Sequence, residues 1–246
     1  MAKPKIGIYG LTGCAGDQLL ILNCEDELLD IVSSVDLKSF IMAQTGNEEC
    51  ELDIAFVDGT VTQERDLEEL REIRGRSGLL IAIGTCAVWG GVAGMRNYTP
   101  RKILKEKVYG EKGDFLKPLP VKPLSAYVRV DFNITGCPIE KEELLKSMAS
   151  LLHGDIPVLP KFALCTECKM NEYECVLSAR GQLCLGPITV AGCGARCPGM
   201  NIACRGCRGP VDEANVASEV NLLQEKGFGL LDIKNKLHTF VPPGQR

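Results

Sequence analysis

Apolar side chains in the first 150 residues occur in short runs, and segments with helical spacing separate these runs. The predicted strands are residues 5–10, 53–59, 78–84 and 127–134, and the predicted helices are residues 19–35, a segment that Thr62 can cap and a segment that starts at Pro138. Strands and helices that alternate in this way are typical of a mostly parallel sheet with helices on both faces. We therefore predict an α/β fold that contains a flavodoxin-like parallel sheet.

The alternation stops after Pro157 and Pro160, where an irregular, cysteine-rich segment begins. This change in pattern predicts a domain boundary near residue 160. The two expected domains are residues 1–160 and 161–246, and the expected helices near the end of the second are residues 211–226 and 229–239.

Eight of the 13 cysteines lie between Cys165 and Cys207, with the spacing Cys-x2-Cys-x6-Cys-x8-Cys-x8-Cys-x3-Cys-x6-Cys-x2-Cys. Large apolar side chains are few in this segment, so we expect it to lack an ordinary core and to depend on metal or disulfide bonds. Eight thiolates form two sets of four, the number that one [4Fe-4S] cluster takes. The short separations and the proline after Cys197 favour iron-sulfur clusters, and structural zinc is the main alternative.

Three other cysteines, Cys14, Cys86 and Cys137, each follow the carboxyl end of a different predicted strand. In an open parallel sheet these ends lie at one edge, where such folds bind ligands, so we expect the three thiols to converge. Asp17 is on the same loop as Cys14 and could complete a site with four ligands. The alternative is that the three cysteines are small buried apolar residues.

Composition and charge narrow the classes of function. The formal net charge is −4 and no run of Lys and Arg occurs, so nothing indicates a nucleic-acid partner. No stretch of 18 apolar residues occurs, and residues 1–10 lead directly into a predicted strand, so we expect neither a membrane span nor a signal segment. We therefore expect a cytoplasmic protein, and in that compartment thirteen cysteines indicate metal or redox chemistry.

The motifs around these cysteines resemble those of one protein family over nearly the whole chain. They are Leu-Thr-Gly-Cys-x-Gly-Asp at 11–17, Gly-Thr-Cys-Ala-x-x-Gly-Gly at 84–91, Thr-Gly-Cys-Pro at 135–138, Cys-Leu-Gly-Pro-x-Thr-x-Ala-Gly-Cys-Gly-x-x-Cys-Pro at 184–198 and Cys-x-Gly-Cys-Arg-Gly-Pro at 204–210. In this combination and order they resemble the small, electron-transferring subunit of a [NiFe] hydrogenase. More narrowly, they are similar to the cytoplasmic multimeric group of these enzymes.

The resemblance implies three [4Fe-4S] clusters and a set of ligands for each. The implied ligands are Cys14, Asp17, Cys86 and Cys137 for the proximal cluster, Cys193, Cys197, Cys204 and Cys207 for the medial cluster, and Cys165, Cys168, Cys175 and Cys184 for the distal cluster. The family usually has a cysteine where this chain has Asp17, and an aspartate there has a precedent in the deazaflavin-reducing relatives. The division of the eight late cysteines could also be crossed between the two clusters.

The resemblance also implies a function without a catalytic residue in this chain. Dihydrogen would be cleaved at the nickel-iron centre of a separate large subunit, and this chain would pass electrons from there to an acceptor subunit that carries flavin or iron-sulfur. The sequence leaves open the terminal acceptor, which could be nicotinamide, deazaflavin, ferredoxin or heterodisulfide, and the number of subunits. Two other functions remain open, namely a related respiratory or hydrogenlyase subunit and a zinc-stabilised binding module.

Overall fold

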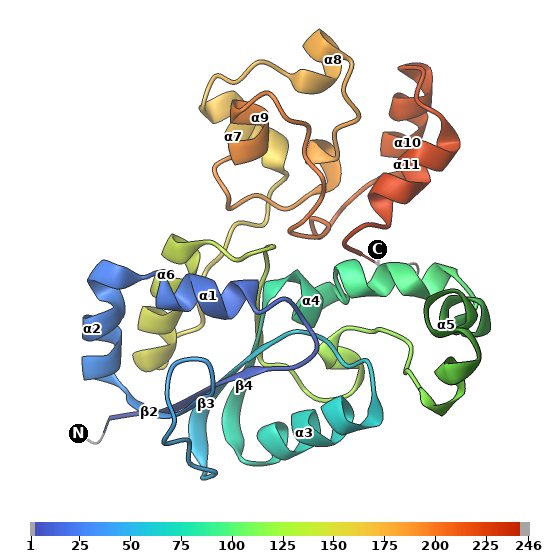
Figure 1. Cartoon of the computed structure of the whole chain (residues 1–246). Coiled ribbons are helices and arrows are strands. Elements are labelled where there is room, and N and C mark those ends of the chain that lie inside the picture. Colours follow the sequence, from blue (N-terminus) through green and yellow to red (C-terminus); the bar gives the residue numbers. More distant parts are fainter. Residues whose placement is uncertain (1–2, 242–246) are drawn as a thin grey trace. The chain divides into compact units, whose positions relative to one another are not determined.

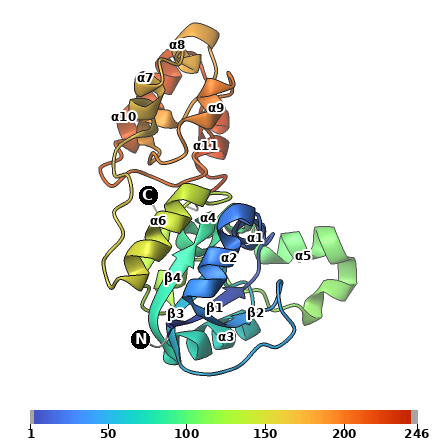
Figure 2. The same ribbon diagram turned by 90° about the vertical axis from the view of Figure 1, so that its left-hand side faces the viewer.

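The computed structural model of the chain describes residues 3–241 (Figures 1 and 2). It divides into two compact units, Met1–Lys141 and Glu142–Arg246. The division falls at the start of α6 (Lys141–Leu152), whereas the sequence pattern placed a boundary near residue 160. We predict that the first domain holds the proximal cluster and that the second holds the medial and distal clusters.

The first unit contains a parallel sheet of five strands in the order β2-β1-β3-β4-β5. The strands are β1 (Lys5–Gly10), β2 (Asp36–Phe40), β3 (Leu52–Asp58), β4 (Ser77–Ile83) and β5 (Phe132–Ile134). This order is that of the flavodoxin-like folds, so the predicted fold class is confirmed. The central strands β1, β3 and β4 are apolar and largely buried, because helices cover both faces of the sheet.

The helices of the first unit connect the strands. They are α1 (Gly16–Leu22), α2 (Glu25–Ser34), α3 (Glu64–Gly75), α4 (Gly84–Trp89), η1 (Val92–Tyr98), α5 (Arg101–Tyr109), η2 (Gly110–Phe115) and η3 (Leu124–Ala126). Helix α3 lies on one face of the sheet, and α1 and α2 lie on the other (Figures 1 and 2). Leu67, Leu70 and Ile73 on the buried side of α3 pack into the core with Leu80 and Val57.

The predicted helix over residues 19–35 is wrong in detail. Two helices, α1 and α2, occupy this region, and Asn23 and Cys24 separate them. The edge strand β2 follows directly and was not predicted. Its sequence, DLKSF, is polar and only half buried, so it lacks the apolar run by which the central strands were recognised.

The predicted cap of α3 is also displaced by one residue. Gln63 rather than Thr62 is the N-cap residue, and Asp66 completes a capping box with it. Thr62 instead donates its backbone N–H to Asp66 Oδ2 at 2.8 Å. The sequence therefore predicted that α3 has a capped N-terminus, and the structure shows that Gln63 and Asp66 form the cap.

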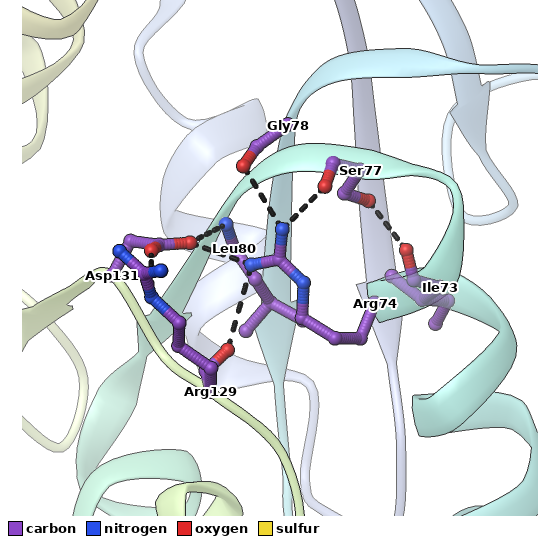
Figure 3. Close-up of polar contacts among 7 residues, drawn as sticks. All are labelled: Ile73, Arg74, Ser77, Gly78, Leu80, Arg129 and Asp131. Carbon is purple, nitrogen blue, oxygen red and sulfur yellow. Dashed lines mark hydrogen bonds and ion pairs between the residues drawn. The ribbon is translucent and has the colours of Figure 1, made fainter.

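Strand β5 is shorter than the predicted run of residues 127–134, and a polar network fixes the chain just before it (Figure 3). Arg74, near the end of α3, contacts Asp131 Oδ2 at 2.5 Å and also donates to the backbone carbonyls of Ser77 and Gly78. The same Asp131 oxygen accepts the N–H of Leu80 at 2.9 Å. One carboxylate thus links α3, β4 and the segment that leads into β5.

The second unit contains short helices and long connecting segments around its own core. Its helices are α6 (Lys141–Leu152), α7 (Leu164–Met170), α8 (Val176–Arg180), η4 (Gly186–Ile188), α9 (Arg196–Gly199), α10 (Val216–Glu225) and α11 (Leu230–Leu237). The last two correspond to the helices expected at 211–226 and 229–239. Leu223 and Ile233 on these helices pack against Leu164, Leu185 and Ile188 of the cysteine-rich segment. The expectation of no ordinary core is therefore wrong, because α10 and α11 supply apolar side chains that the segment lacks.

Within residues 3–241, no helix is both long enough and apolar enough to cross a bilayer.

Candidate metal centres

The first group of thiols lies beyond the carboxyl edge of the sheet in the first unit. Cys14 follows β1, Cys86 lies in α4 directly after β4, and Cys137 follows β5. The pKa of Cys86 is raised to about 12, first by burial and then by the charges of Cys137, Asp58, Asp17 and Cys14. Cys137 has a raised pKa because of burial and the charges of Asp17, Cys14 and Asp58. The three early cysteines are therefore near enough to affect one another's charge, and their role as ligands of one cluster stays a prediction.

Asp17, the proposed companion of these thiols, is a buried side chain in the same group. Its Oδ1 atom accepts the N–H of Ile139 at 2.7 Å. Burial and the neighbouring charge of Asp58 raise the pKa of Asp17 to about 7. Gly84 has a φ of +79°, and a Cβ atom added there would lie 1.9 Å from Asp17 Oδ2. The absence of a side chain at Gly84 therefore makes room for the carboxylate beside the early cysteines.

Asp58 is a member of this group that the sequence interpretation missed. It is the last residue of β3, it is 3% exposed, and Gln18 Nε2 donates to its Oδ2 at 3.3 Å. Its pKa is raised by burial, against the hydrogen bonds that it accepts. Its position could have indicated it, because Asp58 ends a central strand at the same sheet edge that the cysteines occupy.

Glycine backbone packs closely beside two of the early sulfur atoms. A Cβ atom at Gly91 would lie 2.6 Å from Cys86 Sγ, and one at Gly16 would lie 3.3 Å from Cys14 Sγ. Gly91 has a φ of +55°, a conformation that other residues rarely adopt. These positions let backbone approach the sulfur atoms closely, which suits a bulky group bound by them.

The first four late cysteines also come together. Cys165 and Cys168 lie in α7, Cys175 is the N-cap residue of α8, and Cys184 precedes η4. The pKa of Cys165 is raised to about 12, first by burial and then by the charges of Cys184, Cys168 and Cys175. A Cβ atom at Gly186 would lie 3.2 Å from Cys165 Sγ and 3.5 Å from Cys184 Sγ, so a single glycine faces both sulfur atoms.

Among the last four late cysteines, only Cys204 and Cys207 are shown to be neighbours. Burial raises the pKa of Cys204, and the charge of Cys207 contributes to the rise, so these two are neighbours. Cys193 lies in a loop whose backbone is held by Glu167, which accepts the N–H groups of Gly192 at 2.7 Å and Ala195 at 3.0 Å. Cys197 is exposed in α9. Its place in the same set stays a prediction.

Backbone N–H groups point at two of the late sulfur atoms. The N–H of Cys204 donates to Cys184 Sγ at 3.3 Å, and the N–H of Gly206 donates to Cys204 Sγ at 3.4 Å. Such donors favour the thiolate over the thiol, and they tune the potential of iron-sulfur clusters. The first of these bonds also shows that the two sets of late cysteines adjoin.

The donor set fits iron-sulfur clusters. Burial raises the pKa of several of these thiols, among them Cys86, Cys165 and Cys204, and a bound metal cation would reverse this by stabilising the thiolate. The glycines beside the sulfur atoms and the backbone N–H donors are also suited to a bulky cluster that sulfur atoms bind.

Within residues 3–241, no three or more His, Cys, Asp or Glu side chains are close enough to hold a single metal ion.

The fold and the thiols define a class, namely a flavodoxin-like protein with thiols at the sheet edge and a cysteine-rich second unit. Comparison with known proteins then gives the family. The family model described as NADH ubiquinone oxidoreductase, 20 Kd subunit, matches residues 14–151. Sulfhydrogenase 2 subunit delta of Pyrococcus furiosus is 42% identical over 240 residues, which is 96% of this chain and 99% of that protein.

Other relatives agree with this. A subunit of the vhu F420-non-reducing hydrogenase of Methanocaldococcus jannaschii is 32% identical, covering 95% of this chain and 92% of that one. A chain in the crystal structure of an NAD+-reducing [NiFe]-hydrogenase in the H2-reduced state is 28% identical, with a TM-score of 0.58 over 64% of this chain and 96% of that one. A chain of the Ni-Fe-Se hydrogenase from Desulfomicrobium baculatum, 16% identical, shares the fold over 98% of this chain with a TM-score of 0.57.

The chain therefore belongs to the NADH ubiquinone oxidoreductase, 20 Kd subunit, family, and the relatives that it matches over nearly its whole length are subunits of hydrogenases. The resemblance that the motifs indicated is confirmed. The family match at residues 14–151 includes all three early cysteines and ends before the late ones.

Proposed function

We propose that this chain is the electron-transferring small subunit of a [NiFe] hydrogenase, and that it passes electrons between the nickel-iron site of a large subunit and an acceptor subunit. The observation that carries the proposal is the gathering of Cys14, Cys86 and Cys137 at one sheet edge. Full-length similarity to hydrogenase subunits supports it, because that similarity includes the cysteine-rich second unit. A related respiratory or hydrogenlyase subunit without the second unit is therefore disfavoured.

The proposed ligands form three sets, each for one [4Fe-4S] cluster. They are Cys14, Asp17, Cys86 and Cys137 for the proximal cluster, Cys165, Cys168, Cys175 and Cys184 for the distal cluster, and Cys193, Cys197, Cys204 and Cys207 for the medial cluster. When bound, each cluster accepts and releases one electron at a time. Asp17 is a ligand of a different kind, since its carboxylate oxygen is a harder donor than a thiolate.

The residues of the chain hold and shield these sites. Cys204 is buried and Cys86 and Cys165 are partly buried, which limits the access of water to these three ligands, and the backbone donors at Cys204 and Gly206 stabilise thiolates. The chain itself breaks no bond of dihydrogen. That chemistry belongs to the large subunit, and this chain supplies positions and potentials for electron transfer.

We propose a large hydrogenase subunit and an electron-acceptor subunit with flavin or iron-sulfur as the partners, and the cytoplasm as the location. The printed names of relatives support this, since one is a subunit of an NAD-reducing hydrogenase of Cupriavidus necator and another is the iron-sulfur subunit of an F420-non-reducing hydrogenase of Archaeoglobus profundus. Neither a nucleic acid nor a membrane is part of the proposal.

Iron analysis of the anaerobically purified complex tests this function. Three four-iron clusters require about twelve iron atoms per chain and a brown chromophore with broad visible absorption. Cys86→Ser should remove the iron of the early set alone, about four atoms, whereas Cys24→Ser, outside all three sets, should leave the iron content unchanged. A colourless chain loaded with zinc would contradict the proposal and favour a zinc-stabilised binding module.

A further inference from the structure

Arg208 is a buried cation that the proposed ligand sets leave unexplained. It follows Cys207 directly and is 2% exposed. Its Nε donates to the Ala191 carbonyl at 2.8 Å, and its Nη2 donates to the Glu143 carboxylate at 2.7 and 2.8 Å. Its third nitrogen, Nη1, is buried and has no hydrogen-bond partner among residues 3–241. A buried donor on a charged group is costly when it lacks an acceptor, so a missing acceptor is indicated.

The backbone beside Cys193 fixes the place of this cation. A Cβ atom at Gly192 would lie 2.0 Å from Glu143 Oε1 and 2.3 Å from Arg208 Nη2, so the ion pair lies flat against Gly192. The charge of Arg208 lowers the pKa of Cys193, against the larger effect of burial. The guanidinium is therefore close to one late cysteine in space and to Cys207 in sequence.

A purely structural role accounts for only part of this arrangement. A buried Arg–Glu pair joins α6 to the loop of Ala191, but the desolvation of two charges offsets most of what such a pair contributes to stability. It also leaves Nη1 without an acceptor. The sulfur atoms of an iron-sulfur cluster and of its cysteine ligands accept hydrogen bonds, and Cys193 and Cys207 would hold such atoms near Arg208.

We propose that Arg208 is a positioning residue that raises the reduction potential of the medial cluster, and that Nη1 donates a hydrogen bond to a sulfur atom of that cluster or of its cysteine ligands. Glu143 holds the guanidinium in place and partly offsets its charge. The inference rests on the proposed function. Its physical reason is that reduction adds one electron and no proton to the cluster, so a fixed positive charge and an N–H donor stabilise the reduced state.

Charge variants test the inference through a potential rather than through activity. In the anaerobic complex, redox titration followed by electron paramagnetic resonance should show a lower medial potential for Arg208→Gln, by at least a tenfold change in the redox equilibrium, or about 59 mV for one electron. Glu143→Gln should shift it upward, because the guanidinium is then uncompensated. Arg208→Lys keeps the charge and should remain nearer the wild type than Arg208→Gln.

Lys146→Gln is the matched control, because Lys146 is on the same helix as Glu143 and its side chain is 77% exposed. The reduction potential of the medial cluster in Lys146→Gln should equal that of the wild type.

Iron content is measured first for every variant. Absence of clusters in the wild-type complex would refute the proposed function itself. Full iron content with unchanged potentials, or with shifts of the same sign in Arg208→Gln and Glu143→Gln, would overturn the inference alone.

Discussion

Gly84 shows how one residue without a side chain can make room for a buried carboxylate. It joins β4 to α4 with a φ of +79°, and the carboxylate of Asp17 occupies the space that a Cβ atom would need. The conformation and the contact both exclude other residues. The position of the proposed fourth ligand therefore depends on a glycine 67 residues away in the sequence.

Gly84→Ala should displace Asp17 and lower the free energy of unfolding by about 1–3 kcal/mol, the usual cost of overpacking a buried site. The same variant should lose iron from the early set. Both effects are measured on one preparation, by urea unfolding and by iron analysis. Gly75→Ala is the control, since a Cβ atom there meets nothing within 4 Å and should be neutral or slightly stabilising. Full iron content in Gly84→Ala would refute a role for Asp17 as ligand.

Residue identity alone predicted part of this site. Cysteines are uncommon, so three of them placed after three strands stood out and could be assigned to one edge of the sheet. Asp58 did not stand out, because an aspartate before a glycine is also an ordinary turn residue. Arg208 was recognisable only as a letter in a motif. Its burial and its unpaired nitrogen follow from packing, which a single sequence does not specify.

Among the secondary structure elements, β5 depends most on side chains outside itself. Asp131 precedes it and accepts hydrogen bonds from Leu80 and Arg74 (Figure 3). Burial raises the pKa of Asp131, but these bonds outweigh burial and bring it below the ordinary value of 3.8. The carboxylate is therefore more stable in the folded chain than in the unfolded one.

Asp131→Asn should lower the free energy of unfolding of the first unit by about 2 kcal/mol at pH 7. A lowered pKa contributes stability that is present above 3.8 and is lost as the pH falls through the folded value. The difference between variant and wild type should therefore shrink below pH 4. Urea unfolding followed by the fluorescence of Trp89, the single tryptophan, reports on this unit because Trp89 packs against its core. A difference that stays constant from pH 7 to pH 3 would contradict the assignment.

The elements that the sequence predicted well are those with a strong pattern. The central strands and the last two helices have clear apolar periodicity, and the structure shows them within a few residues of the expected ranges. Strand β2 is polar and lies at the edge of the sheet, and most of the predicted run at 127–134 packs on the core without strand pairing. Tertiary contacts determine the structure of these two segments, so the local sequence pattern could not predict it.

At the scale of the whole molecule, the two units differ in what stabilises them. The first has a large apolar core within a hydrogen-bonded sheet. The second is made of short helices and loops, and two of its core residues, Cys184 and Cys204, are also proposed ligands. If these cysteines bind metal as proposed, metal binding and folding should be coupled in the second unit more than in the first.

Removal of iron by anaerobic chelation should unfold much of residues 164–207 and leave the sheet intact. Hydrogen exchange measured by mass spectrometry should show faster exchange in that segment, while β1, β3 and β4 keep their protection. The untreated complex is the reference. Equal exchange of residues 164–207 with and without iron would show that the apolar core alone holds the second unit.

The parallel register of β1, β4 and β5 has a consequence for the biosynthesis of the protein. Cys14, Cys86 and Cys137 can meet only after strands from distant parts of the polypeptide have paired, so we expect their iron to be inserted after the sheet has formed. The late cysteines span 43 residues and follow the sheet in the sequence, so no strand pairing among them has to precede iron binding. Iron binding at the early cysteines should thus depend on a folded first unit, whereas iron binding at the late cysteines should not depend on the sheet.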